Sequence, residues 1–523
     1  MASIFSKWKR HFPFFILYVA FIFLITNSVI FTINYSKQQQ QQQDEVVFQN
    51  TTTYVRTLKN PEWFKVVARE LKDETINIGL VNMDRLKEEV HANAKIVKVH
   101  FDPVGEDIKW SDMAPERIDE NSKCPYIPMP RFEDYHDLDV VVAKVSQRKH
   151  CEDGGLRDVF SVQVNLIVAN LLVRSGRSGK NRPVFAVFVG SCDPMWEIYR
   201  CDDLVWKKGN SFVYKPDLNR IKELLLLPMG ACQFVPPFSN HGEEPWRKLN
   251  QLKNQTKHHL HHPREAYVTV LHTSEDYICG AIILAQSIIQ TNSTKDLILL
   301  ADDNISGQAI KALQEAGWKT KRIKRIHSPF SRKDAYNEWN YSKLRIWQLK
   351  QYDKLMFIEA DMLVNRNLDK FFVYPQMTAA GNYEHHLFNS GLMLVEPSDC
   401  TFNTMMKKMM VVESYNGGDQ GFLNEMFFWW HRLPAQMNYL KVFVNPDDHL
   451  HWINNDVYAV HYTGLKPWKC HKERDCNWDD VKFHRYASHS AHRMWRKVYR
   501  SMPKKLRPYC DIFKNNATSP KGH

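Results

Sequence analysis

Two carboxylates, Glu359 and Asp361, directly follow residues 354–358, KLMFI, which have the pattern of a buried strand. In a strand, positions i and i+2 point to the same face, so the two negative charges repel each other unless a cation lies between them. Carboxylate oxygens are the ligands that hard divalent ions prefer. A solvated acidic pair is the alternative, but a pair at the exit of a buried strand favours a metal site.

A third metal ligand is available at His461, just past a short apolar strand pattern. A lone histidine is usually structural, yet imidazole suits a borderline metal such as manganese better than magnesium. Lys466 follows five residues later, with Gly464 between them. A cation beside a flexible glycine suits a pyrophosphate next to that metal.

Two further segments carry chemistry only in context. Thr273 and Ser274 stand where a strand pattern runs into a helix, so they would either cap that helix or help its amides to hold an anion or a base. Lys343 lies in YSKLRIWQL, residues 341–349, whose large apolar side chains share one helical face. The simplest interpretation of Lys343 is a solvated lysine.

Glycines mark the last two segments. Asn389, Ser390 and Gly391 separate two apolar stretches, as a bulge or a close backbone approach requires. Asp419 and Gln420 lie between glycines at the head of a predicted helix, where a turn with an N-cap is the alternative to a functional role.

The elements that must position these residues alternate between strand and helix. Strand patterns cover residues 266–274, 296–302 and 319–326, and helix patterns cover 277–291 and 307–318. This alternation predicts a parallel sheet with helices on its faces. Ligands of such sheets bind beyond the carboxyl ends of the strands. We assign residues 261–510 to this domain and 511–523 to a tail.

An earlier folded region, residues 61–260, shows no catalytic signature. Its strand patterns lie at 77–82, 95–101, 138–145 and 184–190, and an amphipathic helix is predicted before Gly176. A linker at 253–265 holds four histidines, which a short polar linker explains better than a metal site does.

The N-terminus predicts a membrane anchor. Residues 12–33 carry no charge and are long enough to cross a bilayer, after a basic tail at 1–11 that the positive-inside rule leaves in the cytosol. A glutamine-rich stem, 34–60, precedes the luminal remainder. Asn-x-Ser/Thr patterns at Asn50, Asn254, Asn292 and Asn516, together with ten cysteines, fit an oxidising lumen, and Cys470 with Cys476 would bridge locally.

The net charge of +12 is spread along the chain without an aromatic-interleaved basic block, so we do not expect nucleic-acid binding.

Taken in order, these motifs resemble the glycogenin-type family of retaining, GT-A fold nucleotide-sugar glycosyltransferases. The shared features are Tyr-x-x-Gly, Lys-Leu, acidic-x-acidic, Asn-Ser-Gly, Gly-Gly-Asp-Gln-Gly and His-x-x-Gly-x-Lys-Pro-Trp. Longer stretches, such as HYTGLKPWKCHKERDCNWD, are similar to the plant UDP-glucuronate:xylan alpha-glucuronosyltransferases of the Golgi. The resemblance implies an N-terminal α/β accessory region followed in the chain by an α/β GT-A catalytic domain.

By position, the resemblance implies that Mn2+ is held by Glu359, Asp361 and His461. It implies that uracil and ribose are surrounded by Leu271, Thr273, Ser274 and Tyr277. It places the donor sugar and phosphates against Lys343, Ala360, Asn389, Ser390, Gly391, Gly418, Gly464 and Lys466. Asp419 and Gln420 would lie near the anomeric carbon, with Asp419, Gln420 and Lys466 as catalytic residues. Many relatives have aspartate where this chain has Glu359.

The resemblance also implies the reaction and its partners, a UDP-glucuronate donor and a xylan acceptor. Retention would come from same-face attack, with a covalent intermediate on Asp419 as the alternative. Arg345, Arg332 or Lys333 would meet the donor's carboxylate. The residue chemistry leaves open inositol phosphorylceramide glucuronylation, glycogenin-like glucosylation and a non-catalytic Golgi assembly subunit. We expect a single-pass type II Golgi membrane protein, in a Golgi complex or homo-oligomer.

Overall fold

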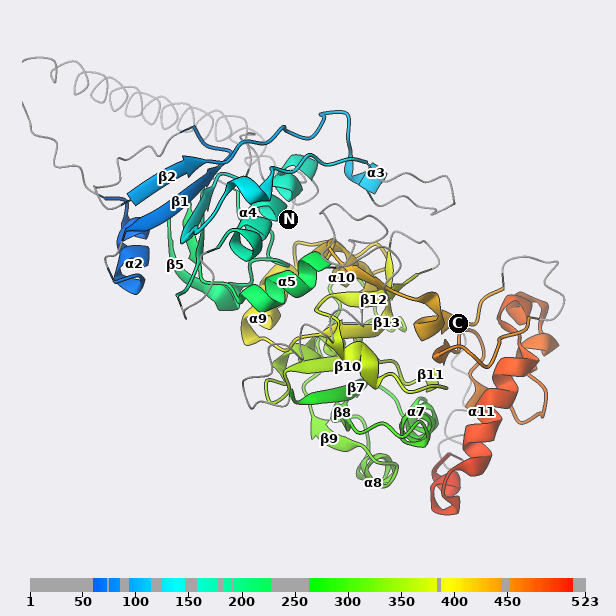
Figure 1. Cartoon of the computed structure of the whole chain (residues 1–523). Coiled ribbons are helices and arrows are strands. Elements are labelled where there is room, and N and C mark those ends of the chain that lie inside the picture. The colour runs from blue at the N-terminus through cyan, green and yellow to red at the C-terminus, as the bar shows by residue number, and fades with distance from the viewer. Residues whose placement is uncertain are drawn as a thin grey trace, which may run out of the picture. The chain divides into compact units, whose positions relative to one another are not determined.

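The computed structural model describes most of the chain beyond the predicted stem (Figure 1). The described residues are 60–72, 75–84, 94–113, 125–145, 158–176, 182–190, 192–226, 263–382, 387–443 and 451–510. They belong to one compact unit, Asn60–His523. The predicted anchor, the predicted stem and most of the histidine-containing linker lie outside these ranges. Within them, none of the helices combines the length and apolar character that a membrane span requires.

A six-stranded sheet with the order β2-β1-β3-β4-β6-β5 forms the first region. The pairings among β1, β2, β3 and β4 are parallel, and β6 pairs antiparallel with β4 and β5. The four strands predicted from the sequence are present. The bounds are β1 Ile76–Val81, β2 Ala94–Lys98, β3 Val140–Ala143, β4 Phe185–Val189, β5 Leu204–Lys208 and β6 Ser211–Tyr214.

Helix α4, Val159–Arg174, forms the centre of the first region's core. Asp158 caps it by accepting a hydrogen bond from the Ser161 amide at 3.3 Å. The predicted helix is present. The prediction that it is amphipathic was wrong, because nearly all of its side chains are buried. A helix that is apolar all round belongs inside a protein. The other helices here are α2 Glu62–Glu70, α3 Trp110–Met113 and α5 Leu218–Leu226.

A seven-stranded sheet with the order β14-β12-β13-β10-β7-β8-β9 forms the second region. The predicted parallel arrangement holds across β10, β7, β8 and β9. It fails at β13, which pairs antiparallel with both β10 and β12. A short connection joins β12 to β13, as an antiparallel pair allows. The bounds are β7 Glu265–Leu271, β8 Asp296–Ala301, β9 Lys319–Arg322, β10 Lys354–Ile358, β12 Thr378–Gly381, β13 Phe388–Val395 and β14 His431–Leu433.

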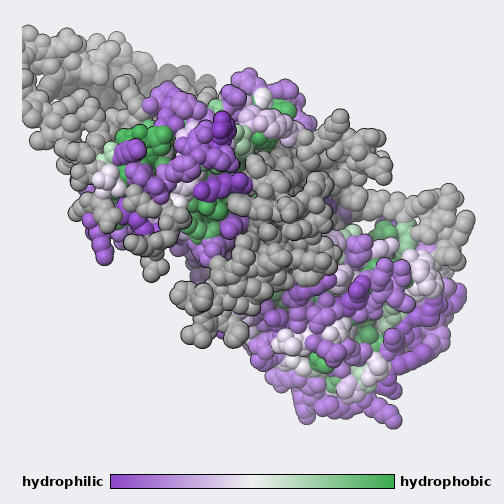
Figure 2. Space-filling model, in the orientation of Figure 1, coloured by the Kyte–Doolittle hydropathy of each residue, from purple (hydrophilic) through white to green (hydrophobic). Residues whose placement is uncertain are grey.

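Helices cover both faces of the second sheet. Successive strand residues point to opposite faces, so each face contributes its own apolar side chains to a core. Tyr267 and Met356 pack with α7, α8 and α11 in one core, whereas Val268 and Phe357 pack with η4, α9 and α10 in another. The bounds are α7 Ile278–Gln290, α8 Gly307–Glu315, η4 Asn340–Gln348, α9 Asp399–Lys408, α10 Asp419–Met426 and α11 His489–Ser501. On the described surface in Figure 2, hydrophilic residues predominate, with scattered hydrophobic ones.

A small third sheet, β11-β16-β15, joins the end of β10 to the C-terminal part of the chain. Its strands are β11 Met362–Val364, β15 Tyr439–Leu440 and β16 Ala459–His461. In its antiparallel β11 to β16 pairing, Met362 lies opposite His461. This register brings the acidic pair after β10 to a histidine that is distant in the sequence.

Candidate active site

The predicted metal ligands converge at the end of β10. Glu359 follows this strand, Asp361 precedes β11, and His461 ends β16. The Nε2 atom of His461 lies 3.2 Å from Glu359 Oε2 and 3.4 Å from Asp361 Oδ1. One ligand atom from each residue lies within 4.8 Å of the other two. Two carboxylates and an imidazole at this spacing match the donor set of a borderline divalent ion.

Gly391 leaves the space on which this cluster depends. A Cβ atom at Gly391 would lie 2.7 Å from His461 Cε1 and 2.9 Å from Glu359 Oε2. Asn438 Oδ1 lies 3.1 Å from His461 Nδ1, and the Asn438 amide donates to Asn389 Oδ1 at 2.8 Å. The partner on Nδ1 orients the ring and leaves Nε2 facing the carboxylates. These residues fit a metal centre.

Strong electrostatic coupling marks the cluster. Burial alone would raise the pKa of Glu359, but Lys343 and His461 outweigh it and lower this pKa to about 2. Burial likewise opposes ionisation of Asp361, yet Lys466 and His461 hold its pKa below the usual range. Burial would lower the pKa of His461, but Asp361 and Glu359 raise it to about 9. The potential at the imidazole is therefore strongly negative, as a cation site requires.

Lys343 connects the acidic pair to Asp419. Its ammonium donates to Glu359 Oε1 at 2.9 Å, to Ser390 Oγ at 3.1 Å and to Asp419 Oδ2. Burial alone would lower the pKa of Lys343, but Asp419 and Glu359 raise it. The interpretation of Lys343 as a solvated lysine is wrong, because its side chain is buried. Three-residue spacing places Tyr341, Leu344 and Trp347 in the core along the 3-10 helix η4 and turns Lys343 towards the site.

Asp419 is the first residue of α10, with Gly418 at the N-cap position. The Asp419 carboxylate does not cap the helix; it accepts from Ser390 Oγ at 2.8 Å as well as from Lys343. Gln420 accepts from the Ser390 amide at 3.2 Å and donates to the Tyr415 hydroxyl at 2.9 Å. The first turn of α10 is thereby fixed against β13.

Asn389, Ser390 and Gly391 lie inside the continuous strand β13 rather than between two strands. The predicted close backbone approach is confirmed at Gly391. The predicted bulge is confirmed, because Ala379 lies opposite Met393 and Gly381 opposite Phe388, which leaves the extra residues of the register shift on β13, between Phe388 and Met393. Ser390 points toward Asp419, and Asn389 toward Asn438.

Lys466 reaches the metal cluster from the other side. Its ammonium donates to Asp361 Oδ2 at 2.7 Å and to the Tyr462 carbonyl at 2.6 Å. Burial would lower the pKa of Lys466, but Asp361 and Tyr277 raise it. Two lysines, Lys343 and Lys466, thus face three carboxylates, those of Glu359, Asp361 and Asp419. With the His461 imidazole neutral, as metal ligation requires, this balance leaves one negative charge for a bound cation to neutralise.

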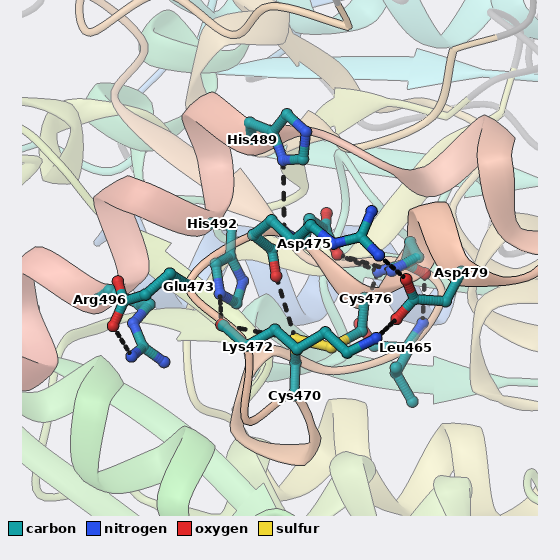
Figure 3. The surroundings of a disulfide bond; sticks show 12 residues. Leu465, Cys470, Lys472, Glu473, Asp475, Cys476, Asp479, His489, His492 and Arg496 are labelled. Atoms are coloured by element: carbon teal, nitrogen blue, oxygen red, sulfur yellow. Dashed lines mark hydrogen bonds and ion pairs between the residues drawn. A yellow bond between two sulfur atoms is a disulfide. The ribbon is translucent and has the colours of Figure 1, made fainter.

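The turn before Lys466 is held by the buried amide of Asn477. This side chain accepts from the Leu465 amide at 2.8 Å and donates to the Leu465 carbonyl at 3.0 Å. Gly464 has a φ of +77°, and a Cβ there would lie 2.5 Å from Asn477 Oδ1. The predicted disulfide between Cys470 and Cys476 closes the adjoining loop, which contains Asp475 (Figure 3).

The predicted nucleotide residues gather at the end of β7. Leu271 ends this strand, and Thr273 has a φ of +74° with its amide bonded to Asp302 Oδ2 at 3.1 Å. The capping role of Thr273 and Ser274 is wrong, since α7 begins four residues after Ser274 and has no side-chain cap. The aromatic ring of Tyr277 is exposed and lies 5.8 Å from Lys466 Nζ.

Close packing fixes the strand ends near the nucleotide residues. A Cβ at Gly280 of α7 would lie 2.4 Å from the carbonyl oxygen of Ala360. Helix α7 therefore lies directly against the backbone between the two metal-ligand candidates. Trp468 donates from its indole to the Asp276 carbonyl at 2.7 Å, which ties the Lys466 segment to the start of the same helix.

Arg345, one of the three cations predicted to meet the donor's carboxylate, is bonded to other groups. The guanidinium of Arg345 donates to the Lys324 carbonyl at 3.0 Å and to Gln348 at 2.9 Å. Arg332 and Lys333 are exposed on a loop whose residue Asn337 donates to the Asn416 carbonyl at 2.6 Å. This contact places their loop against the segment that leads to Asp419.

Sequence reasoning missed several residues that hold the site together. Asp302 carries the same signal as Glu359, an acid directly after a buried strand, and it could have been found that way. The three asparagines, Asn438, Asn477 and Asn416, follow no such pattern. Each acts on backbone or side-chain groups that only the folded chain brings near.

Comparisons with known proteins match both regions. The family model of the GUX1-5 N-terminal domain matches residues 52–232, and that of glycosyl transferase family 8 matches residues 268–377. The putative UDP-glucuronate:xylan alpha-glucuronosyltransferase 4 of Arabidopsis thaliana is 46% identical, over 87% of this chain and 84% of that protein. The UDP-glucuronate:xylan alpha-glucuronosyltransferase 2 of the same plant is 45% identical, over 84% and 76%.

A relative with a different acceptor matches a smaller part. The inositol phosphorylceramide glucuronosyltransferase 1 of Arabidopsis thaliana is 34% identical, over 39% of this chain and 42% of that protein. The match to family 8, together with the mixed sheet, confirms the predicted α/β, GT-A-like fold and the additional α/β region before it. The predicted membrane helix lies outside the described residues.

Proposed function

This chain belongs to the family of UDP-glucuronate:xylan alpha-glucuronosyltransferases, and we propose that it transfers glucuronic acid from UDP-glucuronate in alpha linkage to the xylose backbone of xylan. One observation in the site carries the proposal. Lys343 joins the metal-ligand candidate Glu359 to Asp419, while Lys466 pairs with Asp361. Donor activation and sugar transfer would therefore occur in one connected, partly buried charge network.

We assign the metal site to Mn2+, with Glu359, Asp361 and His461 as ligands. When bound, the ion would neutralise the donor's diphosphate and draw electron density toward it. The longer side chain of Glu359 suits this role, because its two oxygens reach His461 and Lys343 at 3.2 Å and 2.9 Å. This geometry argues against loss of activity through the change from aspartate.

Lys466 is the residue that would stabilise the leaving diphosphate. Cleavage of the sugar-phosphate bond puts negative charge on UDP, and a buried ammonium stabilises that charge far better than water does. Because Lys466 pairs with Asp361, its position is set before the donor arrives. Tyr277, with Leu271, Thr273 and Ser274, would hold the uridine at the adjoining end of β7.

The sugar would lie between β13 and the start of α10. Asn389, Ser390 and Gly391 line one side, and Gly418, Asp419 and Gln420 line the other. As the anomeric carbon gains positive charge, the Asp419 carboxylate would stabilise it electrostatically. The acceptor hydroxyl attacks from the face that UDP leaves, and its proton passes to the departing phosphate oxygen.

Same-face attack fits the surroundings of Asp419 better than a covalent intermediate does. Its Oδ2 atom accepts from both Lys343 and Ser390, which reduces its nucleophilicity. For the donor's own carboxylate, the exposed pair Arg332 and Lys333 are the remaining candidates, since Arg345 is engaged elsewhere.

We also propose the cellular setting that the family suggests. The chain would be a single-pass type II Golgi membrane protein, with residues 12–33 as its anchor and residues 61–510 in the lumen. Within the lumen, residues 61–260 would form the accessory region and 261–510 the catalytic domain. Association in a Golgi complex or homo-oligomer remains a prediction.

The experiment is a transfer assay with the purified full-length protein. UDP-glucuronate, UDP-glucose and UDP-galactose are each offered with xylohexaose or inositol phosphorylceramide, with Mn2+ or with a chelator. We expect transfer only from UDP-glucuronate to xylohexaose, and only with metal. Transfer to the lipid or from UDP-glucose would indicate the related enzymes instead. UDP binding without transfer to any acceptor would indicate a non-catalytic subunit.

A matched pair of histidine variants tests the metal assignment in the same assay. His461→Ala should abolish both transfer and Mn2+ binding measured by calorimetry, because the ion loses its only nitrogen ligand. His136→Ala changes an exposed histidine of the first region and should leave both unchanged. Equal Mn2+ affinity in the two variants would refute the assignment of His461.

A further inference from the structure

Exposed aromatic side chains are unevenly distributed over the described residues. Six are exposed there: Tyr126, Tyr277, Phe330, Tyr336, Tyr415 and Trp452. Three of them, Phe330, Tyr336 and Tyr415, belong to segments that touch residues 416–420, and none of these three rings has a role in the proposed donor site. We call these three the aromatic rim. Exposed rings beside a candidate catalytic centre offer flat apolar faces on which a ligand can pack.

Tyr415 places the rim directly beside the candidate catalytic residues. Its hydroxyl accepts a hydrogen bond from the Gln420 side chain at 2.9 Å, while half of the residue, 50%, stays exposed. Gln420 is adjacent to Asp419 and accepts from the Ser390 amide. The ring of Tyr415 therefore lies next to the place proposed for the donor sugar.

The other two rings lie near the two ends of a loop, residues 328–338. Ser328 closes this loop, because its amide donates to the Glu338 carbonyl and its hydroxyl to the Asn337 carbonyl, both at 2.7 Å. Phe330 is 38% exposed and Tyr336 is 86% exposed. Closure at the base fixes the loop before any ligand binds, which lowers the entropic cost of binding.

This loop packs on the segment that leads into Asp419. A Cβ at Gly417 would lie 2.8 Å from the Phe330 carbonyl oxygen, and one at Gly418 would lie 3.2 Å from Asn337 Cβ. The Asn337 amide also donates to the Asn416 carbonyl at 2.6 Å. Only glycine at position 417, with a φ of +69°, permits such close contact. Rim and catalytic segment are thus one packed assembly.

We propose that the aromatic rim is the acceptor-binding surface, on which successive xylosyl units of the xylan backbone stack. This inference rests on the proposed function. Pyranose rings present flat faces of C–H bonds with hydroxyls at their edges, so they pair with exposed aromatic faces and leave their polar groups in water. Asp334, between Phe330 and Tyr336 in the sequence, offers a polar partner for those edge hydroxyls.

A polysaccharide suits the rim better than a protein partner does. Protein interfaces have a continuous apolar centre from which charged residues are depleted. The rim instead consists of single rings separated by charged and polar residues. The proposed donor site lies at the ends of β7 and β10. The side of Asp419 that carries the rim therefore remains for the acceptor.

Acceptor-dependence kinetics with the full-length protein test the proposal. UDP-glucuronate and Mn2+ are kept saturating while xylohexaose or xylotriose is varied. In Tyr336→Ala and Phe330→Ala, KM for xylohexaose should rise about three- to tenfold, since each stacked ring is worth about that factor. KM for UDP-glucuronate and kcat should stay near their wild-type values, because stacking at a distance acts equally on ground and transition states. The effect should be smaller with xylotriose, which reaches fewer rings.

Conservative and remote variants separate stacking from other roles. Tyr336→Phe should keep the wild-type KM, because the ring remains. Tyr415→Phe keeps the ring but removes the acceptor of the Gln420 hydrogen bond, so it should change kcat rather than KM for xylohexaose. Tyr126→Ala removes a ring that is 80% exposed in the first region and should change neither constant.

The outcomes distinguish this inference from the proposed function. If the wild-type protein transfers nothing to any xylo-oligosaccharide, the proposed function fails. If the wild-type protein is active but Tyr336→Ala and Phe330→Ala retain its KM for xylohexaose, the rim proposal is overturned. A change in molecular mass of Tyr336→Ala in light scattering would also overturn it, because the rim would then be a protein interface. Tyr336 is so exposed that its loss should leave the thermal midpoint unchanged.

Discussion

The two sheets share an architecture but differ at the carboxyl ends of their strands. In the first, the parallel strands β1, β3 and β4 end in residues that support each other, such as Asn82, whose amide donates to the Lys144 carbonyl at 2.7 Å. In the second, β10 leads to Glu359 and Asp361, where they converge with Lys343 of η4 and with Ser390 near the start of the antiparallel strand β13. Among the described residues, only Glu359, Asp361 and His461 form a group able to hold a metal. A shared fold thus says little about activity, which depends on a few strand-end residues.

The first region acts instead as a support for the second. Trp196 donates from its indole to the Met426 carbonyl at 2.8 Å, at the end of the helix that begins with Asp419. Phe428 and Trp429, just beyond that helix, are buried in the first region's core. Arg200 pairs with Glu396 at 2.6 Å, next to β13. The comparison therefore indicates that the second region carries the candidate catalytic residues, while the first region fixes helix α10, which carries Asp419.

The largest expected effect concerns the disulfide between Cys201 and Cys400, which joins the two regions across 199 residues. The double variant Cys201→Ser, Cys400→Ser should lose about 5 kcal/mol in the free energy of unfolding, since a long closed loop restricts the unfolded chain most. Denaturant titration measures this loss. The matched control, with Cys470 and Cys476 replaced by serine, opens a loop of only 6 residues and should lose less. Equal losses would contradict the expectation that the stabilisation grows with the length of the closed loop.

The next effect lies within the catalytic network. Lys343→Met should reduce kcat about 100- to 1000-fold, the range found when one stabilising donor is removed from an active site. Initial rates with UDP-glucuronate and xylohexaose measure this. Lys350→Met serves as the control, because Lys350 is an exposed lysine with 61% of its side chain accessible. A Lys343 variant with near wild-type kcat would show that the link between Glu359 and Asp419 has no catalytic role.

A smaller effect is expected at Glu197, a buried acid between the two regions. Burial raises its pKa to about 8, its Oε2 atom has no hydrogen-bond partner, and Oε1 accepts from the Trp429 amide at 3.4 Å. Lys408 is the charged group that partly opposes the shift. Because the folded-state pKa lies above the unfolded one, the protonated acid contributes full stability below about pH 4.5, and this contribution disappears as the pH rises to about 8.

Glu197→Gln, which mimics the protonated acid, should therefore match the wild type at low pH and become more stable by a few kcal/mol near pH 8. Urea denaturation of both proteins across this pH range measures the difference. A stability difference that stays constant at every pH would mean that the pKa of Glu197 is the same in the folded and the unfolded protein.

The smallest effect is expected from Trp196→Phe, which keeps an aromatic ring against Phe427 but removes the indole donor to Met426. The free energy of unfolding should fall by about 1 kcal/mol, the usual contribution of a single hydrogen bond. If the first region positions α10, kcat should also fall a few-fold while KM for UDP-glucuronate is retained. An unchanged kcat despite lower stability would limit the first region to a role in folding.

Residue patterns by themselves determined much of this protein. Most of the predicted strands, the helix that precedes Gly176, the acidic pair after β10, and the local disulfide all follow from short-range rules of side-chain alternation, helical spacing and cysteine separation. The ordered motifs also predicted the family. These features depend on neighbours in the chain, so sequence alone contains the information.

The tertiary structure decided the rest, because it depends on which distant segments meet. From its sequence pattern, Lys343 was interpreted as a surface lysine. In the structure, the 3-10 helix η4 directs its side chain to Glu359 and Asp419. His461 was already a candidate ligand from the sequence, but it reaches the acidic pair only because β16 pairs with β11 in one particular register. Thr273 resembled a helix cap, yet its amide is bonded to the carboxylate after the neighbouring strand. Long-range pairing and burial select one partner among many for each polar group, and no local pattern records that choice.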